Sequence, residues 1–201
     1  MLRRAGLAVI ALHAAYAFAT IAGFIALPSS SEPIGDPWFA AMELLIIALA
    51  VPVVLFFAAL ARTAQEPRGW FLAALALAAA ALTTSAALHA AVLALPRDHA
   101  LVAGEGAPLA FVWPSAAYAI DILAWDVLFA CALLCAGVGL RGAPAMRPAS
   151  AAFLLAGSVA LAGLIGPLTG SMPLRNLGIL GYALGFPLAV WLTLRALSQK
   201  S

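Results

Sequence analysis

Long apolar stretches alternate with short polar breaks along the whole chain. A helix that crosses a bilayer needs about 20 mostly apolar residues, and six stretches reach that length. They cover residues 5–27, 38–61, 70–95, 115–140, 150–168 and 177–197. The breaks are rich in proline and glycine, as in PSSSEPIGDP at 28–37, and proline removes backbone donors and interrupts helices. We therefore predict an all-α fold: one domain over residues 1–201, a polytopic transmembrane bundle of six helices.

The composition strengthens this prediction. The 201 residues are 66% hydrophobic and 9% charged, whereas about a quarter of the residues of a soluble domain are charged. This excludes a soluble globular protein and a disordered chain. The formal net charge of +2 gives no basic footprint for nucleic acid. The expected partner is the lipid bilayer.

The basic residues predict the orientation. With a cytoplasmic N-terminus, the outer segments hold only Arg97 and Arg175. The inner segments then hold Arg3, Arg4, Arg62, Arg68, Arg141, Arg147, Arg195 and Lys200. Cytoplasmic loops are enriched in Lys and Arg, so we expect both termini to be cytoplasmic. The first stretch, about 23 residues long, exceeds the roughly 7–15 apolar residues of a signal peptide, and we expect it to stay in the membrane.

Ionisable residues within the apolar stretches indicate where a functional site lies, because an Asp there costs about 2.5–3.5 kcal/mol. We counted about 1.5 Å per residue from the Arg or Trp at the inner end of each helix. Glu43 and His89 then lie about 28 Å up, and Asp121 and Arg175 about 30 Å up. Four groups from four helices thus share one depth near the outer boundary of the hydrocarbon.

A second group lies below this level. Asp126, Thr84 and Ser85 lie at about 21–24 Å and would form the floor of an outward-opening pocket. On a regular α-helix Asp126 is about 140° from Asp121, so the two carboxylates are not expected to face one narrow site. We therefore assign Glu43, His89, Asp126 and Arg175 to the inner set and place Asp121 nearer the rim.

We predict that this pocket binds or modifies a small amphipathic or lipid-like molecule. The candidate catalytic residues are Glu43 as acid/base or charge anchor, His89 as its proton partner and Asp126 as the buried counter-charge. Arg175 and Asn176 are expected to bind an anionic or carbonyl group. The other candidate ligand-binding residues are Asp121, Tyr118, Trp125, Thr84 and Ser85.

Several alternatives stay open. Polar residues at the outer interface can reach water without any function. A proton-coupled transporter and a non-catalytic membrane subunit or sensor, with the polar ring as structural glue, fit the same residues. Whether the protein is an enzyme is left undecided.

No cofactor is expected. A bis-histidine haem needs two ligands at one depth, but His13 lies about 15 Å below His89. Zinc held by Glu43, His89 and Asp126 is an alternative that no HExxH spacing supports. Cys131 and Cys135 lie near Gly137 and Gly139, where we expect close helix packing. The GYALG segment at 181–185 is interpreted in the same way, and such small-residue faces also allow oligomers.

Four stretches resemble a known group of proteins: EPIGDPWFAAMELLI at 32–46, TTSAALH at 83–89, AIDILAWDVLFACALLCAG at 119–137 and GPLTGSMPLRNLGILGYALGFP at 166–187. They are similar to small six-helix bacterial membrane proteins of no known activity. The resemblance implies a multi-pass protein of the bacterial inner (plasma) membrane. It implies no substrate and no catalytic residue.

Overall fold

The computed structural model describes residues 1–29, 33–63, 68–104 and 106–199. Within these ranges it contains helices and loops and no strand. Its elements are α1 (Leu2–Ile25), α2 (Trp38–Thr63), α3 (Arg68–Leu93), α4 (Ala116–Ile122), the π-helix η1 (Leu123–Phe129), α5 (Ala130–Leu140), the 3-10 turn η2 (Pro144–Met146), α6 (Arg147–Ala162), α7 (Ile165–Thr169), α8 (Met172–Leu180), the π-helix η3 (Gly181–Gly185) and α9 (Phe186–Ser198).

Six helical spans are long and apolar enough to cross a membrane, which confirms the predicted all-α bundle. They run over Leu2–Ile25, Trp38–Arg62, Arg68–Leu93, Ala116–Leu140, Pro144–Thr169 and Met172–Ser198. The predicted ends shift by a few residues. The shift that affects the site is in the last span, which begins at Met172 rather than at residue 177. Arg175 therefore lies inside a helix.

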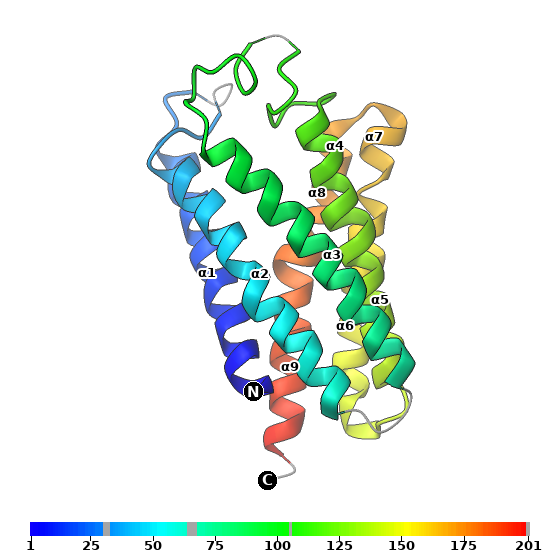
Figure 1. Ribbon diagram of the computed structural model, residues 1–201. Coiled ribbons are helices and arrows are strands. Elements are labelled where there is room, and N and C mark those ends of the chain that lie inside the picture. Colours follow the sequence, from blue (N-terminus) through cyan, green and yellow to red (C-terminus); the bar gives the residue numbers. More distant parts are fainter. Residues whose placement is uncertain (30–32, 64–67, 105, 200–201) are drawn as a thin grey trace.

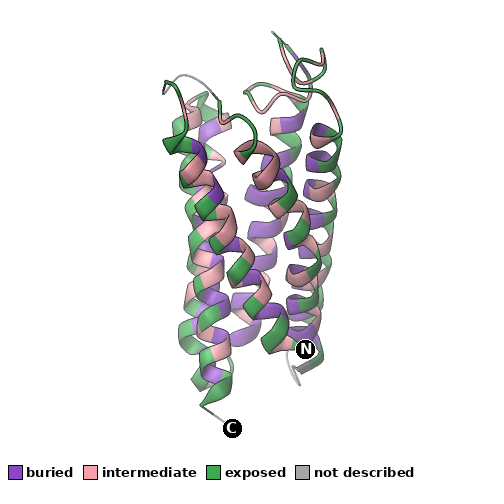
Figure 2. Ribbon diagram, turned by 90° about the vertical axis from the view of Figure 1, so that its left-hand side faces the viewer, coloured by how far each residue is buried: buried purple, intermediate pink, exposed green. Residues whose placement is uncertain are grey.

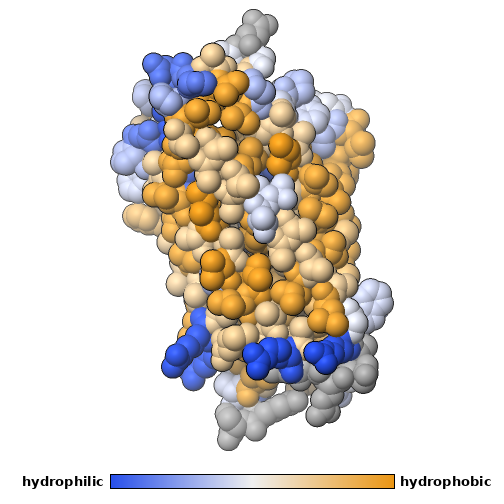
Figure 3. Space-filling model, viewed as in Figure 1, coloured by the Kyte–Doolittle hydropathy of each residue, from blue (hydrophilic) through white to orange (hydrophobic). Residues whose placement is uncertain are grey.

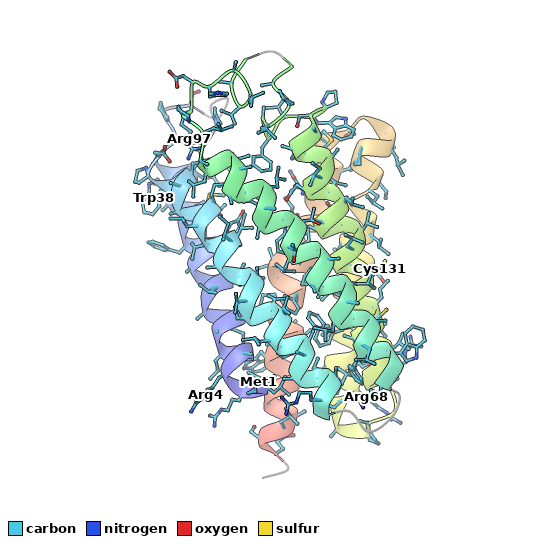
Figure 4. The ribbon with its side chains drawn as sticks, viewed as in Figure 1. Met1, Arg4, Trp38, Arg68, Arg97 and Cys131 are labelled. Atoms are coloured by element: carbon cyan, nitrogen blue, oxygen red, sulfur yellow. The ribbon has the colours of Figure 1, made fainter. Side chains whose placement is uncertain are left out.

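Spans that follow one another in the chain pack side by side, and α9 packs against α1, so that the six spans form a ring (Figure 1). The two termini lie at the same end of the bundle. Arg4 and Arg68 lie at this end, and Trp38 and Arg97 lie at the other (Figure 4). Lys200 lies outside the described residues. An apolar belt separates hydrophilic surface at the two ends (Figure 3), as a bilayer-spanning bundle requires.

The buried residues face the middle of the ring, and exposed ones face outward (Figure 2). In the half nearer the termini, the core is built from rings that contact one another edge-on or stacked. This phenylalanine cluster comprises Phe56, Phe57, Phe129, Phe153 and Phe186, each with no exposed surface. Aromatic pairs of this kind add about 0.5–1.5 kcal/mol each beyond burial, so this half of the bundle is solidly packed.

Small residues bring the last span close to α6, as the GYALG segment predicts. A Cβ at Gly181 would lie 2.5 Å from the carbonyl oxygen of Ala156, and one at Gly185 would lie 2.8 Å from the Cβ of Ala156. These glycines thus serve packing within the chain. Close packing near the two free cysteines is confirmed as well, since a Cβ at Gly137 would lie 2.7 Å from Leu154.

The loop between α3 and α4 folds over the end of the bundle that lies opposite the termini (Figure 1). Phe111, Leu109 and Val102 from this loop pack against Leu88 and Val92 of α3. The loop is joined to the segment before α2 by the pair between Arg97 Nε and Asp36 Oδ2, 3.2 Å apart. It therefore covers the charged residues that lie just below.

Candidate functional site

Five ionisable side chains from four spans meet in the half of the bundle under this loop. They are Glu43 of α2, His89 of α3, Asp121 of α4, Asp126 of η1 and Arg175 of α8, with relative exposures of 4%, 4%, 8%, 0% and 5%. Charged side chains are almost never this buried unless they are paired. Their pairing therefore determines what the site can do.

The five side chains form one continuous series of contacts, which we call the ionic chain. His89 Nδ1 donates to Glu43 Oε2 at 2.7 Å, and His89 Nε2 lies 3.5 Å from Asp121 Oδ1. Arg175 Nη2 donates to Asp121 Oδ2 at 2.7 Å, and Arg175 Nε donates to Asp126 Oδ2 at 3.3 Å. The imidazole and the guanidinium thus each lie between two carboxylates.

Local sequence explains how the helices present these groups. Ser115 caps α4, because its Oγ accepts from the backbone N–H of Tyr118 at 3.1 Å. The turn before α8 uses Gly170 at φ +70°, a left-handed conformation that glycine adopts without strain. A Cβ at Gly166 would lie 2.7 Å from the backbone nitrogen of Arg175, so a small residue there lets α7 and α8 approach each other.

The structure brings together Glu43, His89, Asp121 and Arg175, which the depth count placed at one level. Asp121 is not at the rim: it contacts both His89 and Arg175. Residues 123–129 form a π-helix, whose i→i+5 hydrogen bonds give a wider turn than an α-helix, so the angle of about 140° between Asp121 and Asp126 on a regular α-helix does not apply. Asp121 and Asp126 approach the same guanidinium.

Asp126 is the most deeply buried member of the ionic chain. Its Oδ1 has no hydrogen-bond partner among the described residues, and it lies against Gly178 and Gly163, where an added Cβ would collide with it. Asp126 does not line the cavity described next. Its Oδ2 contacts Arg175 Nε. This contact fits the role of buried counter-charge that the sequence predicts for Asp126.

A cavity of about 240 Å³ lies beside the ionic chain. Most of its wall is apolar or aromatic, and its polar part comes from the ionic chain. The lining residues are His13, Tyr16, Phe39, Met42, Glu43, Ile46, Leu49, His89, Phe111, Tyr118, Asp121, Trp125, Arg175, Ile179, Tyr182 and Ala183. Such a combination of apolar walls and a few polar groups is typical of small-molecule sites.

Four side-chain atoms of the ionic chain make no hydrogen bond to the described residues. Among the described residues, the only fully buried side-chain nitrogen or oxygen atoms without a partner are His89 Nε2 and Asp126 Oδ1. Glu43 Oε1 and Arg175 Nη1 also make no hydrogen bond there, since Glu43 bonds through Oε2 and Arg175 through Nε and Nη2. They therefore keep some accessible surface, and both residues line the cavity.

The other predicted ligand-binding residues are placed differently. Tyr118 and Trp125 line the cavity; the Tyr118 ring centroid lies 5.0 Å from Arg175 Cζ. Ser85 is buried behind the wall, where its Oγ accepts from Trp125 Nε1 at 3.0 Å. Thr84 and Asn176 do not line the cavity, and Asn176 is exposed.

Several lining residues were not predicted. Tyr16 lies three residues after His13 on one helix face, a spacing that would have identified it. Tyr182 belongs to the GYALG segment, whose glycines pointed only to packing. Phe111 lies in a loop, yet its ring stacks on His89 at 5.2 Å, and no periodicity could have placed it.

The metal and haem alternatives can be compared with this geometry. The zinc alternative needs Glu43, His89 and Asp126 together, but Asp126 contacts Arg175, and the carboxylate that approaches His89 is that of Asp121. No group of three or more His, Cys, Asp or Glu side chains in the described part of the chain is arranged to hold a metal ion. His13 donates through Nδ1 to the carbonyl of Val9 at 2.8 Å, within its own helix.

Comparison with protein-family models, with curated proteins and with solved structures found no match to this chain. The function therefore has to be argued from the site itself.

Proposed function

We propose that this multi-pass membrane protein binds a small amphipathic molecule in the cavity. The polar group of the ligand contacts the ionic chain, and its apolar part lies along the side chains of α1, α2 and η3. One observation carries the proposal: Glu43, only 4% exposed, lines a cavity with mainly apolar walls, and its Oε1 makes no hydrogen bond among the described residues. A ligand that donates a hydrogen bond to this oxygen would be stabilised, because hydrogen bonds to charged groups contribute about 1.5–3 kcal/mol.

The cavity also limits the size of the ligand. Its volume of about 240 Å³ is below the roughly 300–1,000 Å³ of common ligand pockets. This favours a molecule with one short apolar part over a two-chain lipid. We further propose that the cavity lies in the outer half of a bacterial inner membrane, with both termini cytoplasmic, as the distribution of basic residues and the resemblance to bacterial membrane proteins suggest.

Binding is better supported than transport. His13 and Trp125, which line the cavity, contact Phe186 and Phe129 of the phenylalanine cluster, with ring centroids 5.5 and 5.3 Å apart. The cavity thus ends at solid aromatic packing on the side of the termini. A path through the protein would require these rings to move.

A specific contact favours modification of the ligand as the second candidate. The 2.7 Å hydrogen bond between His89 and Glu43 is the kind of pairing that general acid–base catalysis uses. A reaction at this site would use Glu43, which lines the cavity, to transfer a proton to or from the ligand.

Native mass spectrometry of the protein, extracted in mild detergent and incubated with total membrane lipid, tests the proposal. We expect a stoichiometric small-molecule adduct on the wild type and on Asn176→Ala, whose side chain lies outside the cavity. Glu43→Gln keeps the shape of the side chain and should lose the adduct, with thermal unfolding used to confirm that it is folded. A bare wild-type chain, or equal retention in the folded Glu43→Gln variant, would contradict the proposal.

A further inference from the structure

We infer that the ligand is a cation: an amphipathic amine in its ammonium form, with the charge held beside Glu43 Oε1. This inference rests on the proposed function and adds the chemical class of the ligand. It departs from the sequence-based expectation that Arg175 and Asn176 bind an anionic or carbonyl group.

The first support is the balance of charges in the ionic chain. Three carboxyl groups face one guanidinium and one imidazole, and each basic group contacts two of the acids. With all three acids ionised, the site is one positive charge short even when His89 is protonated. Charges interact strongly where water is excluded, so a cationic ligand is favoured and an anionic one would add to the excess.

The second support is the kind of atom that is left free. Arg175 keeps Nη1 without a partner among the described residues, but its charge is already shared by Asp121 and Asp126 through Nη2 and Nε. Glu43 Oε1 is an acceptor, and a primary ammonium group supplies donors to it. Asn176, the expected second group for an anion, is exposed and lies outside the cavity.

The third support is the aromatic wall. Six aromatic side chains line the cavity together with Glu43, namely Tyr16, Phe39, Phe111, Tyr118, Trp125 and Tyr182. Ring faces attract ammonium groups, and sites for quaternary ammonium ligands are commonly built from several rings around one acid. Tyr118 already has the Arg175 cation 5.0 Å from its ring centroid.

A matched series of short ligands with the same chain tests the inference: hexylamine, hexyltrimethylammonium, hexanol and hexanoate. Binding to the purified full-length protein is measured by the quenching or shift of tryptophan fluorescence, because Trp125 lines the cavity. We expect the two cations to bind about tenfold tighter than hexanol, which corresponds to one cation–π or ionic contact, and hexanoate to bind most weakly.

Two variants make the result specific. Glu43→Gln should remove the preference of hexylamine over hexanol, whereas Asn176→Ala, whose side chain lies outside the cavity, should leave it unchanged. If Glu43→Gln fails to fold, Phe111→Leu keeps an apolar wall but removes one ring. It should weaken hexyltrimethylammonium several-fold and leave hexanol unchanged.

The outcomes separate the two proposals. Hexanol or hexanoate binding as tightly as the cations would overturn the inference and leave the proposed function standing. A preference for cations that survives in folded Glu43→Gln and Phe111→Leu would also overturn it, because groups other than Glu43 and the Phe111 ring would then recognise the charge. No binding of any of the four, together with a bare chain in the mass spectrum, would overturn the proposed function itself.

Discussion

Replacing Arg175 by methionine should strongly destabilise the protein. The substitution keeps a long apolar side chain and removes the guanidinium that neutralises Asp121 and Asp126. The side chains of Arg175 and Asp126 are 6% and 0% exposed, so water cannot replace the lost partner. Breaking a buried ion pair on one side costs about 3–5 kcal/mol, and we expect a loss of free energy of unfolding in that range.

A second Arg–Asp pair in the same chain provides the control. Arg97 Nε and Asp36 Oδ2 are 3.2 Å apart, against 3.3 Å for Arg175 Nε and Asp126 Oδ2, but the side chains of the exposed pair are 39% and 48% accessible. Exposed pairs contribute about 0.2–1 kcal/mol. Arg97→Met should therefore cost no more than that, although it removes a bond of nearly the same length.

The assay is equilibrium unfolding in mixed micelles, followed by tryptophan fluorescence. The double variant Arg175→Met/Asp126→Asn should recover part of the loss, because it removes one of the two stranded charges. A loss below about 1 kcal/mol for Arg175→Met, equal to that for Arg97→Met, would refute the reasoning. It would mean that Asp121 and Asp126 are hydrated or uncharged in the folded protein.

Three further predictions follow from particular contacts. Gly178→Ala should lower the free energy of unfolding by about 1–3 kcal/mol, because its methyl group would collide with the Asp126 carboxylate. The control is Gly142→Ala, where nothing lies within 4 Å of the new Cβ, and it should leave thermal or denaturant unfolding unchanged. Ser85→Ala should lower the free energy of unfolding by about 1–3 kcal/mol, because Trp125 Nε1 is left without an acceptor. The tryptophan emission should also shift. An unchanged spectrum and an unchanged stability would contradict this prediction. A reporter that is active only in the cytoplasm should be active when fused to either terminus, and activity at neither terminus would reverse the predicted orientation.

The hydrophobic pattern was sufficient for the number and type of helices, because each span must satisfy its own backbone within the bilayer. The depth count succeeded for a related reason. Helices that cross the same slab share one vertical scale, so Glu43, His89, Asp121 and Arg175 could be placed at one level without knowing which helices are neighbours.

What the sequence could not provide was the rotation of the helices and the path of the loops. A π-helical segment has no clear signature in LAWDVLF, yet it changes the angle between Asp121 and Asp126, which both contact Arg175. Asn176 follows Arg175 directly, and adjacent residues on a helix do not share a face, which is why one is buried and the other exposed. Phe111 covers His89 from a loop, and its position depends on tertiary contacts alone.

The ionic chain could also serve only to hold the helices together, and its geometry argues against this as its sole role. Polar contacts between membrane helices contribute only about 0.6 kcal/mol on average, and ionisable residues within membrane spans are costly and rare. A purely structural network would be expected to satisfy its members fully. Here Glu43, which lines an aromatic cavity, bonds His89 through one oxygen, and its other oxygen makes no hydrogen bond among the described residues. A purely structural role gives no reason for the free oxygen of Glu43, and the ligand that we propose would contact it.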